Sequence, residues 1–400
     1  MLPDELPKFS DVKKQFWDNQ RLQFLKQLPS HKDLFLKFHK IKQTLPSKRY
    51  YCHDCHELYT HSDQHRHKNH DSLSNISNQL LENPSKIFKP KDNAKKEAQY
   101  LFSDAAVKTI IDNIIHLKLR HIICIGAPRI HEYIQNNLLD QGYSSLLLDI
   151  DERFRHFFGP LQFCLYNSFN HYFFEGKLSE TVFNDYLKTD NGNGIAIVTD
   201  PPFGGRIEAL SDGIQKITIK YKTFNKISKD LPILWIFPYF MEPHILNSFP
   251  TFSMLDYKVD YDNHSLFTEK PSGRKNGSPV RIFTNITPSK FILPSDEGYK
   301  FCEICQKWVS QENNHCTFCN ECTSKNGTTY KHCSICNRCV KPSWDHCSTC
   351  NRCCLQDHKC GQIEFNNNCF HCKLPGHKKN DCPNINKRSN KRKHSGSKKS

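Results

Sequence analysis

Short apolar runs alternate with amphipathic stretches through the middle of the chain. The strand-like runs, rich in β-branched and aliphatic residues, cover 121–126, 145–151, 194–199, 231–237, 257–267 and 280–286. The stretch 104–119 instead carries its isoleucines at helical spacing. This alternation predicts an α/β fold with a doubly wound, Rossmann-like sheet over residues 96–293.

The amino-terminal segment, residues 1–50, is predicted to be helical. Apolar residues recur at helical spacing from Phe9 to Thr44, and Pro29 interrupts the pattern. Lysine and arginine fill the polar side. This fits a solvated helix surface better than a dedicated RNA-binding helix.

A zinc finger is predicted at 51–71, where two cysteines are followed by several histidines. Its expected ligands are Cys52, Cys55, His65 and His70. Their spacing, C-x2-C-x9-H-x4-H, is typical of zinc fingers. In this pattern His61 or His67 can replace one histidine. The next stretch, 72–95, is rich in Ser, Asn and Lys and is predicted to be a linker.

Composition narrows the class of partner. The formal net charge of +15 favours a polyanionic partner, with a merely basic soluble protein as the alternative. Most of the 20 cysteines lie in C-x2-C pairs mixed with histidine, which indicates zinc binding in a reducing compartment. No apolar run reaches the roughly eighteen residues of a membrane span, and the amino terminus lacks a signal-peptide pattern, so no membrane partner is expected.

The strand at 194–199 ends in an unusual tetrapeptide. It reads Asp200, Pro201, Pro202 and Phe203, and two glycines follow it. The prolines end the strand, so the carboxylate of Asp200 and the carbonyl of Pro201 can both accept hydrogen bonds from an exocyclic amine. Phe203 can stack on a base, a contact worth about 1–3 kcal/mol. The motif therefore predicts methylation of a base amine, with an ordinary Asp-Pro turn as the alternative.

A second ligand-binding signal lies at the ends of two earlier strands. The run 121–126 ends at Gly126, which permits close backbone approach. The run 145–151 ends in acids about 20 residues later, where a carboxylate can hydrogen-bond ribose hydroxyls. Asp149 and Asp151 are rivals for that role, and either can instead cap the next helix. Asn167 opens a loop that, by chain order, reaches the same edge.

From Cys302 onward the chain repeats C-x2-C, a gap, then histidine and cysteine. The sets are Cys302, Cys305, His315, Cys322; Cys316, Cys319, His332, Cys339; Cys333, Cys336, His346, Cys353; and Cys347, Cys350, His358, Cys360. The second set has three extra residues in its gap, and the fourth uses leftover residues. Closed Cys3His sites are structural, so residues 300–362 are predicted to be an interleaved zinc scaffold that unfolds without metal. The spacing resembles the cysteine-rich domain of palmitoyltransferases, but the Asp-His-His-Cys motif is incomplete and acyl transfer is not expected.

Residues 367–384 contain the most specific pattern in the chain. Cys369, Cys372, His377 and Cys382 give the zinc-knuckle spacing C-x2-C-x4-H-x4-C. Such knuckles bind single-stranded nucleic acid, mostly RNA, so Phe370, Lys378 and Lys379 are expected RNA contacts, with a protein-binding knuckle as the alternative. The basic run 385–400 is expected to be a disordered tail suited to nuclear or nucleolar targeting.

Together these motifs resemble the zinc-knuckle (CCHC) containing ribosomal RNA N6-adenosine methyltransferases, from about residue 50 to residue 385. The tetrapeptide is similar to the D/N-P-P-F/Y/W motif of amino-methyltransferases. The resemblance implies a class I methyltransferase domain with S-adenosyl-L-methionine as donor. It implies catalytic roles for Asp200, Pro201, Pro202 and Phe203, and donor contacts from Ile125, Gly126, Ala127, Pro128, Arg129, Asp149, Asp151 and Asn167.

The same resemblance implies the substrate and its location. The expected substrate is an adenosine N6 in large-subunit ribosomal RNA, with ribosome-assembly proteins as further partners. The expected location is the nucleus and nucleolus, with the cytoplasm in addition. About five or six zinc ions are expected from closed four-ligand sites. The alternative is a non-catalytic RNA-binding or ubiquitin-ligase-type adaptor with a degenerate methyltransferase fold, which need not bind the donor.

Overall fold

The computed structural model describes residues 11–90, 99–263 and 278–360, and these divide into two units. The first comprises residues 11–312 with 325–328, and the second comprises 313–324 with 329–360. The first unit therefore contains the amino-terminal helices and the Cys52 region in addition to the predicted Rossmann-like domain. In the described part of the chain, no helix combines the length and the apolar character needed to span a membrane.

The apolar runs of the middle region form an eight-stranded sheet in the first unit. Its strands, in spatial order, are β10 (Ser253–Met254), β11 (Val280–Thr284), β9 (Ile233–Pro238), β8 (Ile195–Thr199), β4 (His121–Ile125), β5 (Ser144–Asp149), β6 (Phe163–Asn167) and β7 (Tyr172–Phe173). Neighbours from β9 to β6 are parallel, whereas β11 is antiparallel to both of its neighbours and β7 is antiparallel to β6. The strand order reverses at β4, which confirms the α/β prediction and creates a switch point at its carboxyl end.

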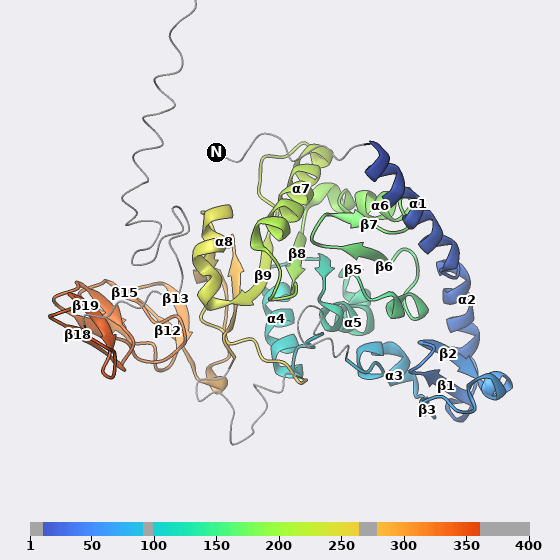
Figure 1. Cartoon of the computed structure of the whole chain (residues 1–400), viewed down its shortest axis with the longest axis horizontal. Coiled ribbons are helices and arrows are strands. Elements are labelled where there is room, and N and C mark those ends of the chain that lie inside the picture. The colour runs from blue at the N-terminus through green and yellow to red at the C-terminus, as the bar shows by residue number, and fades with distance from the viewer. Residues whose placement is uncertain (1–10, 91–98, 264–277, 361–400) are drawn as a thin grey trace, which may run out of the picture. The chain divides into compact units, whose positions relative to one another are not determined.

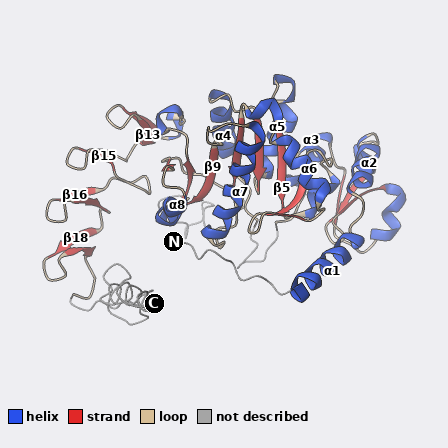
Figure 2. Ribbon diagram, turned by 90° about the horizontal axis from the view of Figure 1, so that it is seen from above, coloured by secondary structure: helices blue, strands red, loops and turns tan. Residues whose placement is uncertain are grey.

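Helices cover both faces of this sheet (Figure 2). They are α4 (Asp104–His116), α5 (Pro128–Asn137), α6 (Lys177–Tyr186), α7 (Ile207–Asn225) and α8 (Glu242–Ser248). Successive strand residues enter different cores: Ile122 and Cys124 pack with α4 and α5, whereas Ile123 packs with α6, α7 and α8. Burial on both faces explains why the strands are continuous apolar runs rather than alternating ones.

One predicted strand is absent from the part of its run that the structure describes, residues 257–263. In the described residues of the run 257–267, Tyr261 makes only an isolated bridge with Phe102. The segment before it follows β11 irregularly: Leu255 N–H donates to the Ile282 carbonyl and Val259 N–H donates to the Val280 carbonyl. The chain thus advances four residues from Leu255 to Val259 while β11 advances only two, so a regular hydrogen-bond ladder cannot continue.

The amino-terminal segment forms two helices, as predicted. They are α1 (Asp11–Gln27) and α2 (His31–Lys42), and they run beside the β6–β7 side of the sheet (Figure 1). Ser30, directly after Pro29, caps α2 by accepting a hydrogen bond from the Asp33 N–H. Phe38 is buried in the same apolar core as α4 and α5, so α2 is an integral part of this unit.

The segment predicted to be a linker is structured over its described residues, 72–90. A three-stranded sheet joins β1 (Arg49–Cys52), β2 (Glu57–Thr60) and β3 (Ser72–Ser74), and α3 (Asn78–Glu82) follows. Ile76, Leu81 and Phe88 are buried in the core shared with α4 and α5. The apolar residues of this stretch are too few and too widely spaced in the sequence to form a periodic pattern, so the sequence did not predict its structure.

Short hairpins dominate the cysteine-rich region. In the first unit β12 (Tyr299–Cys302) pairs with β13 (Lys307–Ser310). The second unit contains β14 (His315–Cys316), β15 (Glu321–Cys322), β16 (Lys331–Cys333), β17 (Arg338–Val340), β18 (Trp344–Cys347) and β19 (Arg352–Leu355), paired in sequence order. Short 3-10 helices occur at Pro46–Lys48, His61–His67, Pro84–Lys86, Leu139–Gln141, Glu152–His156, Thr189–Gly192, Tyr239–Met241, Pro288–Lys290 and Ser295–Glu297.

Candidate active site and metal centres

The carboxyl ends of β4, β5 and β8 are joined by backbone hydrogen bonds at the switch point. Asp200 N–H donates to the Ile125 carbonyl at 3.0 Å, and Gly126 N–H donates to the Leu148 carbonyl at 3.0 Å. Gly126 has φ of +64°, and a Cβ there would lie 2.9 Å from the Asp200 carbonyl oxygen. Only glycine allows this turn to approach the strand end so closely.

A cavity of about 760 Å³ opens at this edge of the sheet. The predicted site residues that line it are Ile125, Gly126, Pro128, Asp149, Asp151, Asn167, Asp200, Pro201, Pro202 and Phe203. Two other predicted donor contacts do not line the cavity. Ala127 is fully buried, and the Arg129 guanidinium donates to the Asp262 carboxylate and the Phe102 carbonyl. Arg129 is therefore held by structural contacts away from the cavity.

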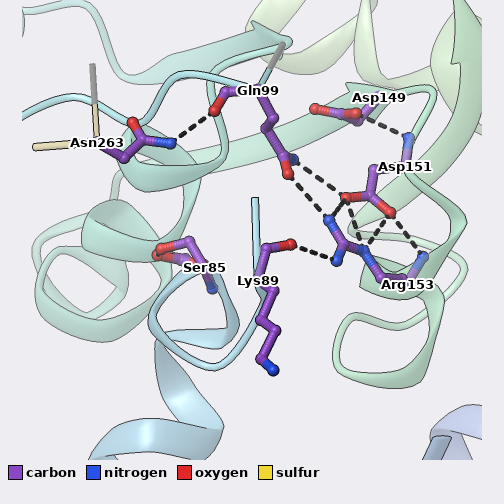
Figure 3. A network of polar contacts seen from close by, with 8 residues as sticks. Ser85, Lys89, Gln99, Asp149, Asp151, Arg153 and Asn263 are labelled. Carbon is purple, nitrogen blue, oxygen red and sulfur yellow. Dashed lines mark hydrogen bonds and ion pairs between the residues drawn. The ribbon is translucent and has the colours of Figure 1, made fainter. Parts of the chain in front are cut away.

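The two rival aspartates of the donor site differ in their surroundings (Figure 3). The Asp151 carboxylate accepts hydrogen bonds from the Arg153 side chain, at 2.6 Å from Nη2, and from Gln99 Nε2 at 3.1 Å. It also accepts the Arg153 N–H as the cap of the following turn, so the capping alternative applies to Asp151. Asp149 accepts the backbone N–H of Asp151 at 2.9 Å. Asp151 is engaged by the Arg153 side chain and by the cap of the following turn, which favours Asp149 as the ribose contact.

The acceptor tetrapeptide is surrounded by aromatic side chains. Asp200 Oδ1 accepts a hydrogen bond from the Tyr261 hydroxyl at 2.8 Å. Burial raises the pKa of the Asp200 carboxyl well above its ordinary value, while the hydrogen bond from Tyr261 lowers it. The Phe203 ring lies 6.1 Å from the Tyr100 ring with 25° between their planes. Tyr100 and Gln99 also line the cavity, and no sequence motif marked them.

The second of the two glycines after Phe203, Gly205, makes room for another ring. A Cβ on Gly205 would lie 2.5 Å from Phe169 Cε1. Phe169 belongs to the loop that Asn167 opens and lines the same cavity. The loop after β6 and the loop after β8 therefore meet over the cavity.

This arrangement suits methyl transfer. A carboxylate and a carbonyl at a strand end face a cavity large enough for a nucleoside cofactor, as ligand pockets of about 300–1,000 Å³ are. The glycine turn and the carboxylate of Asp149 fit the backbone-and-ribose contacts that S-adenosylmethionine requires.

The structure gathers a four-ligand group at the predicted finger, with one change of histidine. Cys52, Cys55, His67 and His70 lie together, whereas the His65 ring contacts the Ser62 carbonyl. Cys55 Sγ lies 3.1 Å from His70 Nδ1. The buried His67 has no hydrogen-bond partner for either ring nitrogen among the described residues, and a zinc ion would satisfy one of them. The histidines are too closely spaced in sequence for spacing alone to choose between them.

Three of the four ladder sets lie entirely in the second unit, and the structure brings the members of each together. They are Cys316, Cys319, His332, Cys339; Cys333, Cys336, His346, Cys353; and Cys347, Cys350, His358, Cys360. One pair of sulfur atoms in each set lies 3.7, 3.6 and 3.5 Å apart, respectively: Cys319 and Cys339, Cys336 and Cys353, and Cys347 and Cys360. Ligand atoms of a tetrahedral zinc site lie roughly 3.3–3.8 Å apart, given bonds of about 2.0–2.3 Å. The donor atoms thus fit zinc.

The remaining predicted metal ligands stay predictions. The first ladder set divides between the units: Cys302 and Cys305 belong to the first, and His315 and Cys322 to the second. The zinc knuckle (Cys369, Cys372, His377, Cys382) and its expected RNA contacts (Phe370, Lys378, Lys379) lie outside the described residues.

Sequence comparisons match the part of the chain that contains this site. The family described as "Probable N6-adenine methyltransferase" matches residues 93–285. The human rRNA N(6)-adenosine-methyltransferase ZCCHC4 is 48% identical over 365 residues, which cover 89% of this chain and 70% of the relative. The mouse protein of the same name is 46% identical, with 85% and 67% covered. That of Xenopus tropicalis is 43% identical, with 88% and 73% covered.

Proposed function

The chain belongs to the family of the rRNA N6-adenosine methyltransferases named ZCCHC4, and from this premise we propose that it methylates N6 of an adenosine in large-subunit ribosomal RNA. One observation carries the proposal: Asp200–Phe203 ends β8 on the wall of the same cavity that Gly126 and Asp149 line. Acceptor and donor residues thus meet in one space, which methyl transfer requires.

Asp200 and the Pro201 carbonyl hold the target amine in this proposal. The N6 lone pair of adenine is delocalised into the ring, so the amine is a weak nucleophile. Hydrogen bonds from its two N–H groups to these oxygens favour tetrahedral geometry at nitrogen and aim the lone pair into the cavity. Phe203 stacks on the base, which must leave its helix or come from a loop to reach the site.

S-adenosylmethionine supplies an electrophilic methyl group when bound. We assign its ribose to Asp149 and the close backbone approach to Gly126, while Ile125, Pro128 and Asn167 line its pocket. The reaction then needs little beyond orientation, because proximity of donor and acceptor supplies much of the rate. The proton can leave the amine after transfer.

The Cys/His groups are proposed to bind about five or six zinc ions, each in a closed, structural site. Counting the finger, four ladder sets and the knuckle gives six. We assign RNA contacts to the knuckle residues Phe370, Lys378 and Lys379, and we place the enzyme in the nucleus and nucleolus, with ribosome-assembly proteins as neighbours. The basic tail at 385–400 supports this location.

An Asp200→Ala variant tests the assignment. It is expected to abolish methylation of ribosomal RNA from cells that lack the enzyme, measured by mass spectrometry of nucleosides from separated large and small subunits. Donor affinity, measured by calorimetry, should be nearly unchanged. The matched control is Asp212→Ala, which removes an exposed carboxylate that pairs with Lys216 across one turn of α7.

Each result has a separate meaning. Turnover by Asp200→Ala would reject the acceptor role. Methylation confined to the small-subunit RNA would reject the proposed substrate. Failure of the wild-type protein to bind S-adenosylmethionine would favour the adaptor alternative.

A further inference from the structure

Tyr261 contacts the acceptor aspartate directly. Its hydroxyl donates to Asp200 Oδ1 at 2.8 Å, and its side chain is buried, with 4% of the residue exposed. Among the described residues, the Tyr261 hydroxyl is the one hydrogen-bond donor to the Asp200 carboxylate. The second oxygen, Oδ2, has no hydrogen-bond partner among the described residues, and Asp200 lines the cavity. One oxygen is thus held by protein while the other is available to a ligand.

The same side chain also contacts the stacking residue. The Tyr261 and Phe203 rings lie 6.1 Å apart with 74° between their planes, in an edge-to-face arrangement. Tyr261 packs against Tyr100 as well, at 5.9 Å between ring centroids. Tyr261 therefore contacts both the carboxylate that would hold the amine and the ring that would stack on the base.

The backbone around Tyr261 is fixed on both sides. Ser103 N–H donates to the Asp260 carbonyl at 2.9 Å, and Asp262 N–H donates to the Leu101 carbonyl at 3.0 Å. Asn263 Nδ2 donates to the Gln99 carbonyl at 2.6 Å, and the Gln99 side chain continues to Asp151 and Arg153 (Figure 3). Tyr261 is thus held against the segment that forms one wall of the cavity.

We propose that Tyr261 is a positioning residue for methyl transfer, which orients the Asp200 carboxylate so that Oδ2 faces the substrate amine. This proposal rests on the acceptor role proposed above for Asp200. The Tyr261 hydroxyl does not touch substrate or donor. It acts by restricting rotation of the carboxylate and by holding its ionised form.

The protonation state of Asp200 matters because a protonated Oδ2 would present a donor to the amine N–H. Burial raises the pKa of Asp200, and the Tyr261 hydrogen bond opposes that rise. Burial also raises the pKa of Tyr261, and the charges of Asp200 and Asp260 raise it further, so the phenol stays protonated as a donor. Next to it, Asp262 is paired with Arg129. Among the described residues, Tyr261 is the titratable group that shifts the pKa of Asp200.

A Tyr261→Phe variant tests the proposal in the full-length protein, because it removes the hydroxyl and keeps the ring. We expect kcat to fall about tenfold, as the loss of one hydrogen bond to a charged group in the transition state predicts. Affinities for S-adenosylmethionine and for RNA should change less than about twofold. The rising limb of the pH–rate profile should move to higher pH, because the pKa of Asp200 loses the interaction that lowers it.

The matched control is Tyr257→Phe. Tyr257 is buried in the same segment, with 2% exposed, but Thr109, and not Asp200, is among the groups that affect the pKa of its hydroxyl. It should lower thermal stability by a similar amount without moving the pH profile. Asp200→Asn supplies the second comparison. Because an amide does not titrate, this variant should lack the rising limb of the pH–rate profile. Adding Tyr261→Phe to it should leave the pH–rate profile unchanged.

The outcomes separate this inference from the proposed function. If Asp200→Ala is inactive but Tyr261→Phe matches Tyr257→Phe in kcat and pH profile, the positioning role is rejected and the acceptor role stands. If Tyr261→Phe loses activity together with donor affinity, and loses more thermal stability than Tyr257→Phe, its role is structural and the inference fails. If Asp200→Ala is active, the acceptor role itself fails.

Discussion

At the scale of single residues, Gly126 couples the two halves of the site. Its left-handed backbone leaves the end of β4, and its missing side chain lets the Asp200 carbonyl approach. The donor turn and the acceptor strand end therefore cannot move independently. A substitution at Gly126 should therefore displace Asp200, although the two residues are 74 positions apart in the sequence.

Gly126→Ala tests this coupling. The left-handed φ alone costs an L-residue roughly 1–2 kcal/mol, and displacement of the Asp200 carbonyl adds an overpacking cost of about 1–3 kcal/mol. We expect urea denaturation to show the summed loss and calorimetry to show much weaker donor binding. Turnover should fall with it.

Gly298→Ala is the matched control for this substitution. Gly298 has φ of +85°, and its Cβ would meet no atom within 4 Å. This variant should show the backbone cost alone, with donor affinity unchanged. Equal behaviour of the two variants would contradict the coupling.

The place of a residue in the fold can be predicted from the sequence where local chemistry marks its position. Gly126 and Asp200 stand at ends of apolar runs and are followed by turn-forming residues, so the sequence places them at a sheet edge. Tyr261 and Gln99 carry no such mark, because only tertiary packing brings their segments to the cavity. His67 replaces His65 in the finger for a related reason: two histidines two residues apart fit the same spacing.

At the scale of elements, the segment expected to be a linker is attached to α5 by a buried carboxylate. Glu132 is 2% exposed and accepts hydrogen bonds from the Ser85 N–H at 2.8 Å and the Ser85 hydroxyl at 2.6 Å. Burial raises the pKa of Glu132 to about 7, against the lowering effect of these hydrogen bonds and of Arg129. The contact therefore has a pH dependence.

Glu132→Gln should reveal that dependence. Between about pH 4.5 and pH 7 the folded protein retains a proton that the unfolded chain has released, so the free energy of unfolding falls as the pH rises. The loss is at most about 3 kcal/mol for the whole window. Glutamine does not titrate and can still accept from Ser85, so the variant should be less sensitive to pH. Urea denaturation at pH 5 and pH 8 measures both proteins.

The control for this experiment is Glu208→Gln at an exposed position on α7. Because histidines titrate in the same window, the informative quantity is the difference between each variant and wild type. A Glu132→Gln protein whose stability follows the wild-type pH curve would show that the buried carboxylate is not the group responsible.

The irregular spacing of the second ladder set also has a structural counterpart. Its three extra residues fall in the gap between Cys319 and His332, and Lys325–Thr328 in this gap belongs to the first unit. Lys325 pairs there with Glu242, the first residue of α8. The repeat predicted which cysteines and histidines group together. No feature of the sequence indicated that the inserted residues would pack with the first unit.

At the scale of the whole molecule, the two units are stabilised by different physics. The first buries apolar side chains on both faces of an eight-stranded sheet. The described part of the second exposes large apolar residues, with Phe318 79% and Ile335 68% exposed, and its strands are two to four residues long. Isolated hairpins of this length are marginal in water, so the Cys/His groups must supply the stability.

Removal of metal should therefore act selectively. Native mass spectrometry of the full chain is expected to find roughly five or six zinc ions, and a chelator strong enough to remove them should abolish hydrogen-exchange protection in β16–β19. Strands β4, β5 and β8 should keep their protection, because their amides are buried between two apolar layers. Restored zinc should restore the hairpins. Protection that persists in β16–β19 after mass spectrometry shows complete metal loss would mean that an apolar core, and not zinc, holds the second unit.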